Sequence, residues 1–177
     1  MIMKLKDLIR AVGYQLRYGK GIHFGKLPRF EKGARINLIN GKIHIGESFV
    51  MKPNAYIAVV DGGTLTIGNN VAIARSSILV CHDRISIADG CAIAPNVTIY
   101  DHDHKFGPEG IRPGYNTAPV VIERNCWIGA GVTILRGTRI GEGSVIGAGC
   151  IVKGNIPPHS LVTSDRSLTV TPITERK

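Results

Sequence analysis

Residues 100–107 read YDHDHKFG, a stretch in which His102 and His104 are two positions apart and alternate with Asp101 and Asp103. An imidazole titrates near neutral pH, so a histidine beside a carboxylate can act as a general acid or base. Histidine is also a common metal ligand. A third interpretation is a hydrated, charged loop without chemistry. These residues alone are compatible with all three interpretations. Which of them holds depends on the elements that position the histidines.

Aliphatic residues recur every six positions along most of the chain. The positions in phase are Ile39, Ile45, Met51 and Ile57; Ile67, Ile73 and Leu79; Ile87, Ile93 and Ile99; and Ile122, Ile128, Ile134, Ile140, Ile146 and Val152. Glycine recurs one or three places after these positions, as expected for corners that need a positive φ. Each hexad therefore predicts one short strand and one turn, and stacked coils of hexads predict an all-β solenoid, a parallel β-helix, over residues 36–158.

The cysteines follow the same period in part. Cys91, Cys126 and Cys150 lie four places after an aliphatic position, where residues are compact, and we expect them to be buried. Cys81 falls outside this phase, and we expect it to be accessible. No two cysteines have the spacing of a zinc site.

The period breaks between Ile57 and Ile67, between Leu79 and Ile87, and between Ile99 and Ile122. The last break is the longest and contains the two histidines. We predict a loop that protrudes from the solenoid at about residues 100–119. A stiff repeat scaffold positions such excursions, and they often carry function.

The chain of 177 residues has a formal charge of +9, and most of it lies near the N-terminus. Residues 1–35 contain nine Lys or Arg and two acidic residues. Within them, residues 2–18 place Ile2, Leu5, Ile9, Val12 and Leu16 on one face of a predicted helix. This basic helical segment could cap the coil stack, contact a membrane or another anionic partner, or be a solvated arm.

The length favours one domain. No apolar run approaches the ~20 residues of a membrane span, and no secretory signal is evident. We therefore expect a cytoplasmic protein with reduced thiols. Residues 159–177 form a C-terminal tail to which we assign no structure.

The segment IAPNVTIYDHDHKFG, the runs IGAGVTI and IGEGSVIGAG, and the terminal IPP resemble the hexapeptide-repeat acyltransferases. The most similar branch is that of the sugar O-acetyltransferases, which includes galactoside and maltose acetyltransferases and enzymes of polysaccharide biosynthesis. The resemblance implies a left-handed β-helix and a homotrimer with its active sites between neighbouring subunits. It also implies acetyl-CoA as cosubstrate, no metal, a small-molecule sugar acceptor and no nucleic acid.

The resemblance also suggests site residues. Aligned on the PNVT motif, His104 is the general base, and Asp101 is a candidate to orient it, with Asp103 and Glu109 left open. The acceptor would contact His102, Asp103 and Ser76. The acyl and pantetheine parts of the cofactor would contact Trp127, Ala130 and Ala148, with Trp127 also near the acceptor. The cofactor phosphates would contact Lys153 and Arg166.

Three alternatives remain at this point. The acceptor could be an amine, an amino acid or an antibiotic. The chain could be a zinc enzyme like the γ-class carbonic anhydrases, which share this fold, with His82, His102 and His104 as ligands. It could also be a scaffold without catalytic activity.

Overall fold

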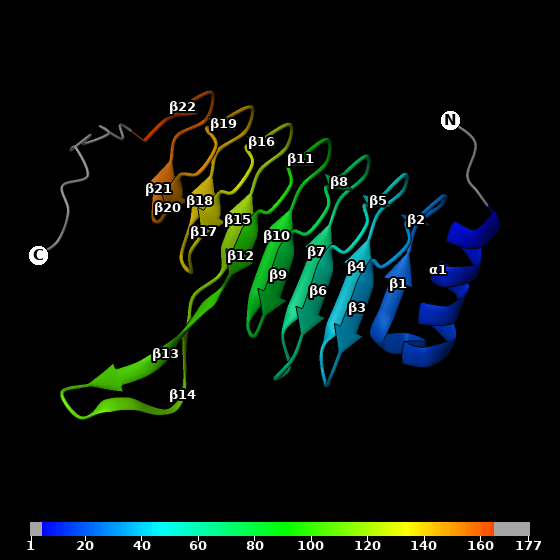
Figure 1. Ribbon diagram of the computed structural model, residues 1–177, viewed down its shortest axis with the longest axis horizontal. Coiled ribbons are helices and arrows are strands. Elements are labelled where there is room, and N and C mark those ends of the chain that lie inside the picture. The colour runs from blue at the N-terminus through cyan, green and yellow to red at the C-terminus, as the bar shows by residue number, and fades with distance from the viewer. Residues whose placement is uncertain (1–4, 165–177) are drawn as a thin grey trace, which may run out of the picture.

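The computed structural model describes residues 5–164, and they form a solenoid whose three faces are parallel β-sheets (Figure 1). Face A consists of β1 (Ile22–Phe24), β4 (Lys42–Ile45), β7 (Thr64–Ile67), β10 (Arg84–Ile87), β15 (Val120–Ile122), β18 (Arg139–Ile140) and β21 (Asn155–Ile156). Face B consists of β2 (Arg29–Phe30), β5 (Val50–Met51), β8 (Ala72–Ile73), β11 (Ala92–Ile93), β16 (Trp127–Ile128), β19 (Val145–Ile146) and β22 (Leu161–Val162). Face C consists of β3 (Arg35–Leu38), β6 (Tyr56–Val59), β9 (Ile78–Cys81), β12 (Thr98–Tyr100), β17 (Thr133–Ile134) and β20 (Ile151–Val152).

The parallel β-helix predicted from the hexads is confirmed, and it matches the left-handed form that the resemblance implied, but its limits differ from residues 36–158. Strands β1 and β2 lie within the segment 1–35 and pair in parallel register with β4 and β5. Strand β22 lies within the segment 159–177 and pairs with β19. The coil stack is therefore longer at both ends than the sequence period indicated.

The interior is a stack of aliphatic side chains in register, for example Ile45 beside Ile67 and Ile67 beside Ile87. Cys91, Cys126 and Cys150 are buried as predicted. The prediction for Cys81 was wrong, because β9 is four residues long and its alternation turns both Leu79 and Cys81 inward. Ile39 lies at a corner after β3 and is exposed, while Ile36 takes the inward position beside Ile57.

The two glycine series have different causes. The glycines three places after an aliphatic position have positive φ as predicted, for example Gly131 at 67° and Gly143 at 66°. The glycines one place after an aliphatic position do not have positive φ. At Gly141 an added Cβ would lie 2.4 Å from the backbone nitrogen of Pro158 in the next coil. This second series allows the coils to approach each other closely.

The connections between faces form three edges along the solenoid. The C–A edge, where face C leads to face A, comprises residues 39–41, 60–63, 82–83, 101–119, 135–138 and 153–154. The B–C edge comprises residues 31–34, 52–55, 74–77, 94–97, 129–132 and 147–150. All three breaks of the sequence period fall on the C–A edge. The longest of them is an antiparallel hairpin of β13 (His102–Gly107) and β14 (Gly110–Thr117), so the segment predicted as a loop is regular structure (Figure 1).

A helix, α1 (Leu5–Tyr18), lies across the first coil, and a short 3-10 turn, η1 (Gly19–Gly21), leads from it into β1 (Figure 1). The predicted helix is confirmed from residue 5, and Ile2 lies outside the described residues. Its buried residues are Asp7 and Ala11, whereas the predicted apolar face is turned away from the coil. Among residues 5–164 no helix is long and apolar enough to cross a bilayer.

We predict that Gly141→Ala lowers the free energy of unfolding by about 1–3 kcal/mol, the usual cost of overpacking. The neighbouring atoms of Pro158 belong to the backbone and cannot turn aside. The matched control is Gly13→Ala on α1, where an added Cβ meets nothing within 4 Å. That change should raise the stability by about 0.5–1 kcal/mol. Chemical denaturation of both variants checks this, and equal effects at the two sites would contradict the close-approach explanation.

Candidate functional site

The hairpin begins with a carboxylate–imidazole pair. Asp101, the last residue before β13, is fully buried. Its Oδ1 lies 3.1 Å from Nδ1 of His102, the first residue of the hairpin. The contact fixes the ring of His102 and leaves its Nε2 as the free nitrogen. A buried carboxylate that orients an imidazole in this way is a common element of general-base sites.

Asp101 is itself held by the backbone of the preceding coil. Its carboxylate accepts hydrogen bonds from the backbone N–H of His82 (2.9 and 3.1 Å) and from that of Asp83 (2.8 Å). These bonds satisfy the buried charge and fix the carboxylate on the C–A edge. The sequence placed Asp101 near the histidines, but its contact is with His102 rather than with His104.

Three aromatic rings surround His102. The ring of His82 lies 3.8 Å from that of His102 between centroids, and the rings of Tyr115 and Tyr100 lie at 5.1 and 5.6 Å. Nδ1 of His82 lies 2.8 Å from a carboxylate oxygen of Asp61 without being aligned for a hydrogen bond. His82 was named only as a zinc ligand, and Tyr115 was missed, because it joins the site through hairpin pairing that no local motif indicates.

His104 lies on the same face of β13 as His102, since the two are separated by two residues. It is exposed, and its ring lies 4.8 Å from that of Tyr115. In the described chain His104 has no hydrogen bond or ion pair with a carboxylate. Asp103 projects to the other face of β13, where Nε of Arg136 donates to its carboxylate. Arg136 comes from the following coil and was not identified from the sequence.

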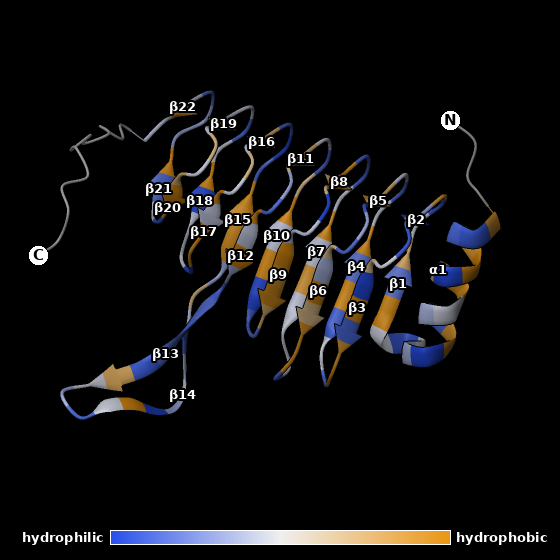
Figure 2. Ribbon diagram, viewed as in Figure 1, coloured by the Kyte–Doolittle hydropathy of each residue, from blue (hydrophilic) through white to orange (hydrophobic). Residues whose placement is uncertain are grey.

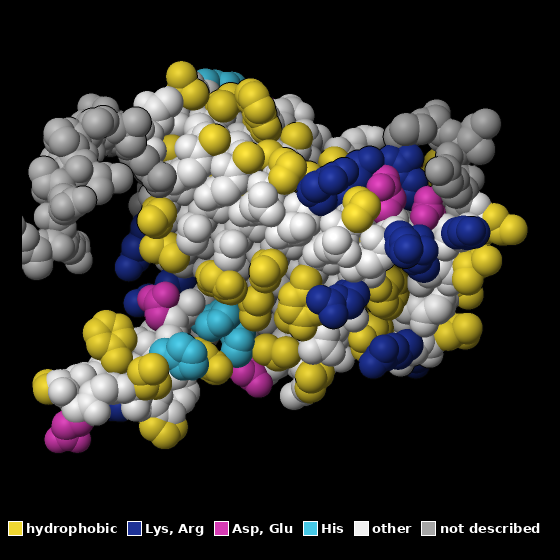
Figure 3. Space-filling view, viewed as in Figure 1, with side chains coloured by type: hydrophobic (Ala, Val, Ile, Leu, Met, Phe, Trp, Pro, Cys, Tyr) yellow, Lys and Arg dark blue, Asp and Glu magenta, His cyan; other side chains and the backbone are white. Residues whose placement is uncertain are grey.

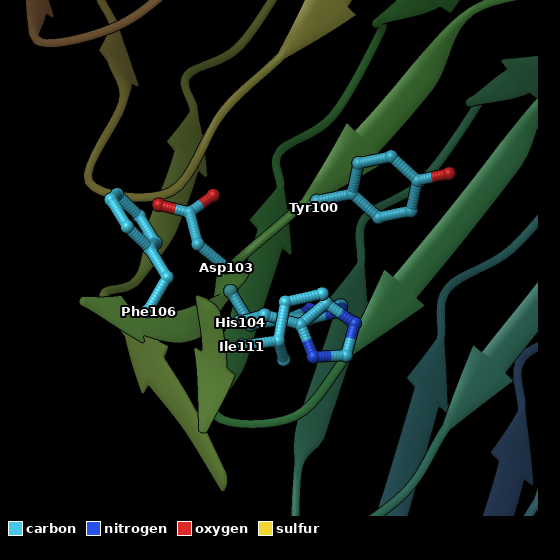
Figure 4. A pocket seen from close by; sticks show the side chains of 6 residues that line it. Tyr100, Asp103, His104, Phe106 and Ile111 are labelled. Carbon is cyan, nitrogen blue, oxygen red and sulfur yellow. The ribbon is translucent and has the colours of Figure 1, made fainter. Parts of the chain in front are cut away.

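The histidines line an open cleft of about 770 Å³ between the hairpin and β12. Its walls are Tyr100, His102, Asp103, His104, Phe106 and Ile111. Figure 4 shows that most of these side chains come from the hairpin, with Tyr100 contributed by β12. Histidine side chains gather where the hairpin leaves the solenoid (Figure 3). Exposed Phe106 and Ile111 give the cleft an apolar outer part and the imidazoles give it a polar base.

The other predicted site residues lie elsewhere on the chain. Ser76, Ala130 and Ala148 are exposed on the B–C edge, and Trp127 is 56% exposed on face B. Lys153 is exposed on the C–A edge, in a later coil than the histidines. Arg166 lies outside the described residues. One chain therefore separates Trp127, Ala130 and Ala148 from the histidine cleft.

Burial lowers the pKa of the His102 imidazole below its ordinary value, and the nearby His82 acts in the same direction. The hydrogen bond from His102 to the carboxylate of Asp101 acts in the opposite direction and only partly compensates. His102 is therefore neutral at pH 7 and can accept a proton. Within residues 5–164 no group of three or more His, Cys, Asp or Glu side chains is placed to hold a metal ion.

Comparisons with known proteins agree with this fold. The family model described as "Bacterial transferase hexapeptide (six repeats)" matches residues 119–154. The galactoside O-acetyltransferase of Lactococcus lactis is 38% identical over 65% of this chain and 56% of its own length. That of Escherichia coli is 36% identical over the same shares. A solved galactoside acetyltransferase in complex with coenzyme A has a TM-score of 0.53 and 31% identity over 65% of this chain and 60% of its own.

The chain thus spans little more than half the length of these curated relatives. All three relatives are named as acetyltransferases of galactosides.

We predict that Asp101→Asn lowers the pKa of His102 further, because the hydrogen bond that raises it is weakened while the burial stays. NMR titration of the histidine ring protons measures this. Asp103→Asn is the matched control, since Asp103 is the weakest of the groups that raise this pKa, and it should cause a smaller decrease. Unchanged signals from the exposed His23 and His44 would confirm a folded protein. A pKa that stays the same or rises in Asp101→Asn would contradict the pair.

Proposed function

The chain belongs to the hexapeptide-repeat family of bacterial transferases, and we propose that it transfers an acetyl group from acetyl-CoA to a hydroxyl of a sugar or saccharide precursor. The observation that carries the proposal is the Asp101–His102 pair at the base of an open cleft on this scaffold. The relatives named as galactoside O-acetyltransferases support a sugar hydroxyl as the acceptor. The relatives are named as transferases, which disfavours the zinc-enzyme alternative.

A sugar hydroxyl is a weak nucleophile at neutral pH. In the proposed reaction Nε2 of a cleft histidine removes its proton while the oxygen attacks the thioester carbonyl of acetyl-CoA. The tetrahedral intermediate collapses with cleavage of the carbon–sulfur bond, and the imidazolium returns the proton to the coenzyme A thiolate. The products are the acetyl ester and free coenzyme A, and the histidine ends the cycle neutral.

The geometry favours His102 as this base over His104, which the PNVT alignment indicated. His102 is largely buried, with 13% of its side chain exposed, and it is oriented by Asp101 and neutral at pH 7. His104 is exposed and lies nearer the open part of the cleft, which suits contact with the acceptor. Asp103 is bound to Arg136, so we assign it to shaping the cleft beside the acceptor.

A homotrimer would complete the site. Because the histidines lie on the C–A edge and Ser76, Ala130 and Ala148 on the B–C edge, a cofactor that contacts both needs two chains. Cyclic trimers place a different edge of each neighbour in every interface. We therefore propose that acetyl-CoA lies between subunits, along Trp127, Ala130 and Ala148 of one chain and the hairpin of the next. Lys153 and Arg166 are the proposed phosphate contacts.

The direct test of the proposed function is release of the coenzyme A thiol from acetyl-CoA in the presence of a panel of acceptors. The panel contains galactosides, nucleotide-linked sugars, lipid-linked saccharides, amino sugars and amino acids. Turnover with hydroxyl acceptors supports the proposal. Turnover with amines alone would assign an N-acetyltransferase, and no turnover with any acceptor would favour the scaffold without catalytic activity.

We predict that His102→Ala lowers kcat by about 10²–10⁴, the usual effect of removing a general base. His104→Ala should lower activity less and mainly through KM for the acceptor. Both side chains lie on the protruding hairpin, so coenzyme A binding and the thermal melt should stay close to wild type. The PNVT alignment predicts the reverse order of the two variants, so kcat and KM measured side by side distinguish the two assignments.

The pH profile gives a second readout. A histidine base stops working when it becomes protonated, which happens on the acid side of its pKa. Because the pKa of His102 is lowered, the acid limb of the kcat/KM profile should have its midpoint below 6.5. A midpoint above that value would exclude His102 as the base.

We predict that two inactive variants restore activity when combined. His102→Ala removes the proposed base, and Ala148→Trp fills the proposed cofactor channel on the other edge. Trimers assembled from equal amounts should regain about a quarter of the sites, because one in four interfaces combines the two intact edges. Light scattering verifies the trimer. If mixed trimers form and stay inactive, the site does not lie between subunits.

A further inference from the structure

The helix α1 carries its apolar stripe on the side that faces solvent. Leu5, Ile9, Val12 and Leu16 are 72, 60, 49 and 81% exposed, and they follow one another at spacings of three and four residues. Figure 2 shows apolar residues along the outer side of α1, away from β1. Exposed Leu8 and Leu27 border a groove of about 600 Å³ between α1 and the first coil and continue the stripe onto that coil. A surface of this kind marks an interaction site.

Hydrogen bonds fix this orientation of the helix. On the opposite side of α1, the guanidinium of Arg10 donates to the carbonyl of Phe30 (2.8 Å). The hydroxyls of Tyr14 and Tyr18 donate to the carbonyls of Ala34 and Ile36, both at 2.9 Å. Rotating α1 to bury its leucines would break all three bonds and leave carbonyls of the first coil without donors. These hydrogen bonds therefore keep the apolar stripe exposed to solvent.

The surroundings of the stripe are mainly basic, although exposed Glu47 also lines the groove. Lys6 and Arg17 lie on α1, and Lys20 and Lys26 follow it, all of them exposed. The only carboxylate on α1, Asp7, is buried and paired with Arg10. Figure 3 shows Lys and Arg side chains gathered at this end of the solenoid. A helix with an apolar face flanked by cations is suited to lie in the interface of an anionic bilayer.

We infer that α1 binds the surface of an anionic lipid bilayer, with its apolar stripe inserted among the acyl chains and its cations at the headgroups. Two copies of this chain meeting through the same face would place their cations against each other, which disfavours a second copy as the occupant. Because α1 lies across the end of the solenoid, this docking sets the long axis of the solenoid away from the membrane (Figure 1).

The height of the cleft then follows from the fold. The hairpin that carries His102 leaves the solenoid from the fourth coil. The distance from the first coil to the fourth is three strand spacings, or about 14 Å at the usual spacing of parallel strands. The packing of α1 on that coil adds about 10 Å. The cleft would stand roughly 25 Å from the lipid, a height suited to the saccharide of a lipid-linked acceptor. Only this last step rests on the proposed function; the docking does not.

The experiment is co-sedimentation of the full chain with phosphatidylcholine vesicles, with and without about 30 mol% phosphatidylglycerol. We expect binding to the anionic vesicles that weakens as salt is raised. The double variant Ile9→Gln/Leu16→Gln should bind about tenfold or more weakly, because two inserted side chains are lost. Lys6→Gln/Arg17→Gln should lose a similar factor at low salt. Leu161→Gln, which removes a side chain that is 71% exposed at the opposite end of the solenoid, is the matched control and should bind normally.

The substituted residues are exposed, so thermal melts should show that every variant folds. Absence of sedimentation with anionic vesicles at low salt would overturn the inference. So would equal binding by Ile9→Gln/Leu16→Gln and Leu161→Gln. If the Ile9→Gln/Leu16→Gln protein instead has a smaller mass by light scattering, a second copy covers the stripe and the inference is wrong. Acceptor turnover is a separate measurement, so failure of the docking and failure of the proposed function can be distinguished.

Discussion

Neighbouring coils of this solenoid are held together by backbone hydrogen bonds, and every other feature must respect the register of those bonds. Many of the strands are only two residues long and could not persist alone. The N–H of Glu31 donates to the carbonyl of Met51, and that of Leu135 to the carbonyl of Val152, so the same pattern runs along the stack. Residues inserted beyond the six-residue repeat cannot pair in this ladder of hydrogen bonds. They therefore protrude from the solenoid at one of its edges. The hairpin is the largest such departure.

Asp101 shows how the ladder is maintained where the hairpin leaves it. One coil earlier, the N–H of Val60 donates to the backbone carbonyl of Cys81. The corresponding pair one coil on is His82 and Asp101, but the carbonyl of Asp101 now accepts from Ala118, where the chain returns from the hairpin. The carboxylate of Asp101 takes its place and accepts from His82 and Asp83. The same carboxylate contacts His102, so one side chain both closes the solenoid and orients the proposed base.

The sequence predicted what depends on local period and missed what depends on contacts between coils. The six-residue recurrence revealed the solenoid, its filled interior and the place of the excursion. It did not reveal the first coil, because the inward positions there are Phe24 and Phe30 rather than aliphatic residues, although Gly25 and Gly33 keep the two glycine offsets. It misplaced Cys81, because strand length rather than hexad phase decides which way that side chain points. In the cleft the motif indicated the right segment but not the partners of the two histidines. The N–H of His82 helps to fix Asp101 beside His102, and hairpin pairing places Tyr115 beside His104.

The same distinction explains the helix. An amphipathic pattern reveals that one face is apolar, but the surface that the helix covers decides which face turns inward. The carbonyls of Phe30 and Ala34 correspond to those of Met51 and Ala55, which accept hydrogen bonds from the preceding coil. The first coil has no predecessor, so these carbonyls require donors from elsewhere. Leucine side chains have none to offer, whereas Arg10 and Tyr14 do. The exposed edge of the sheet therefore selects the polar face of α1, and the apolar face is left for a partner outside the chain.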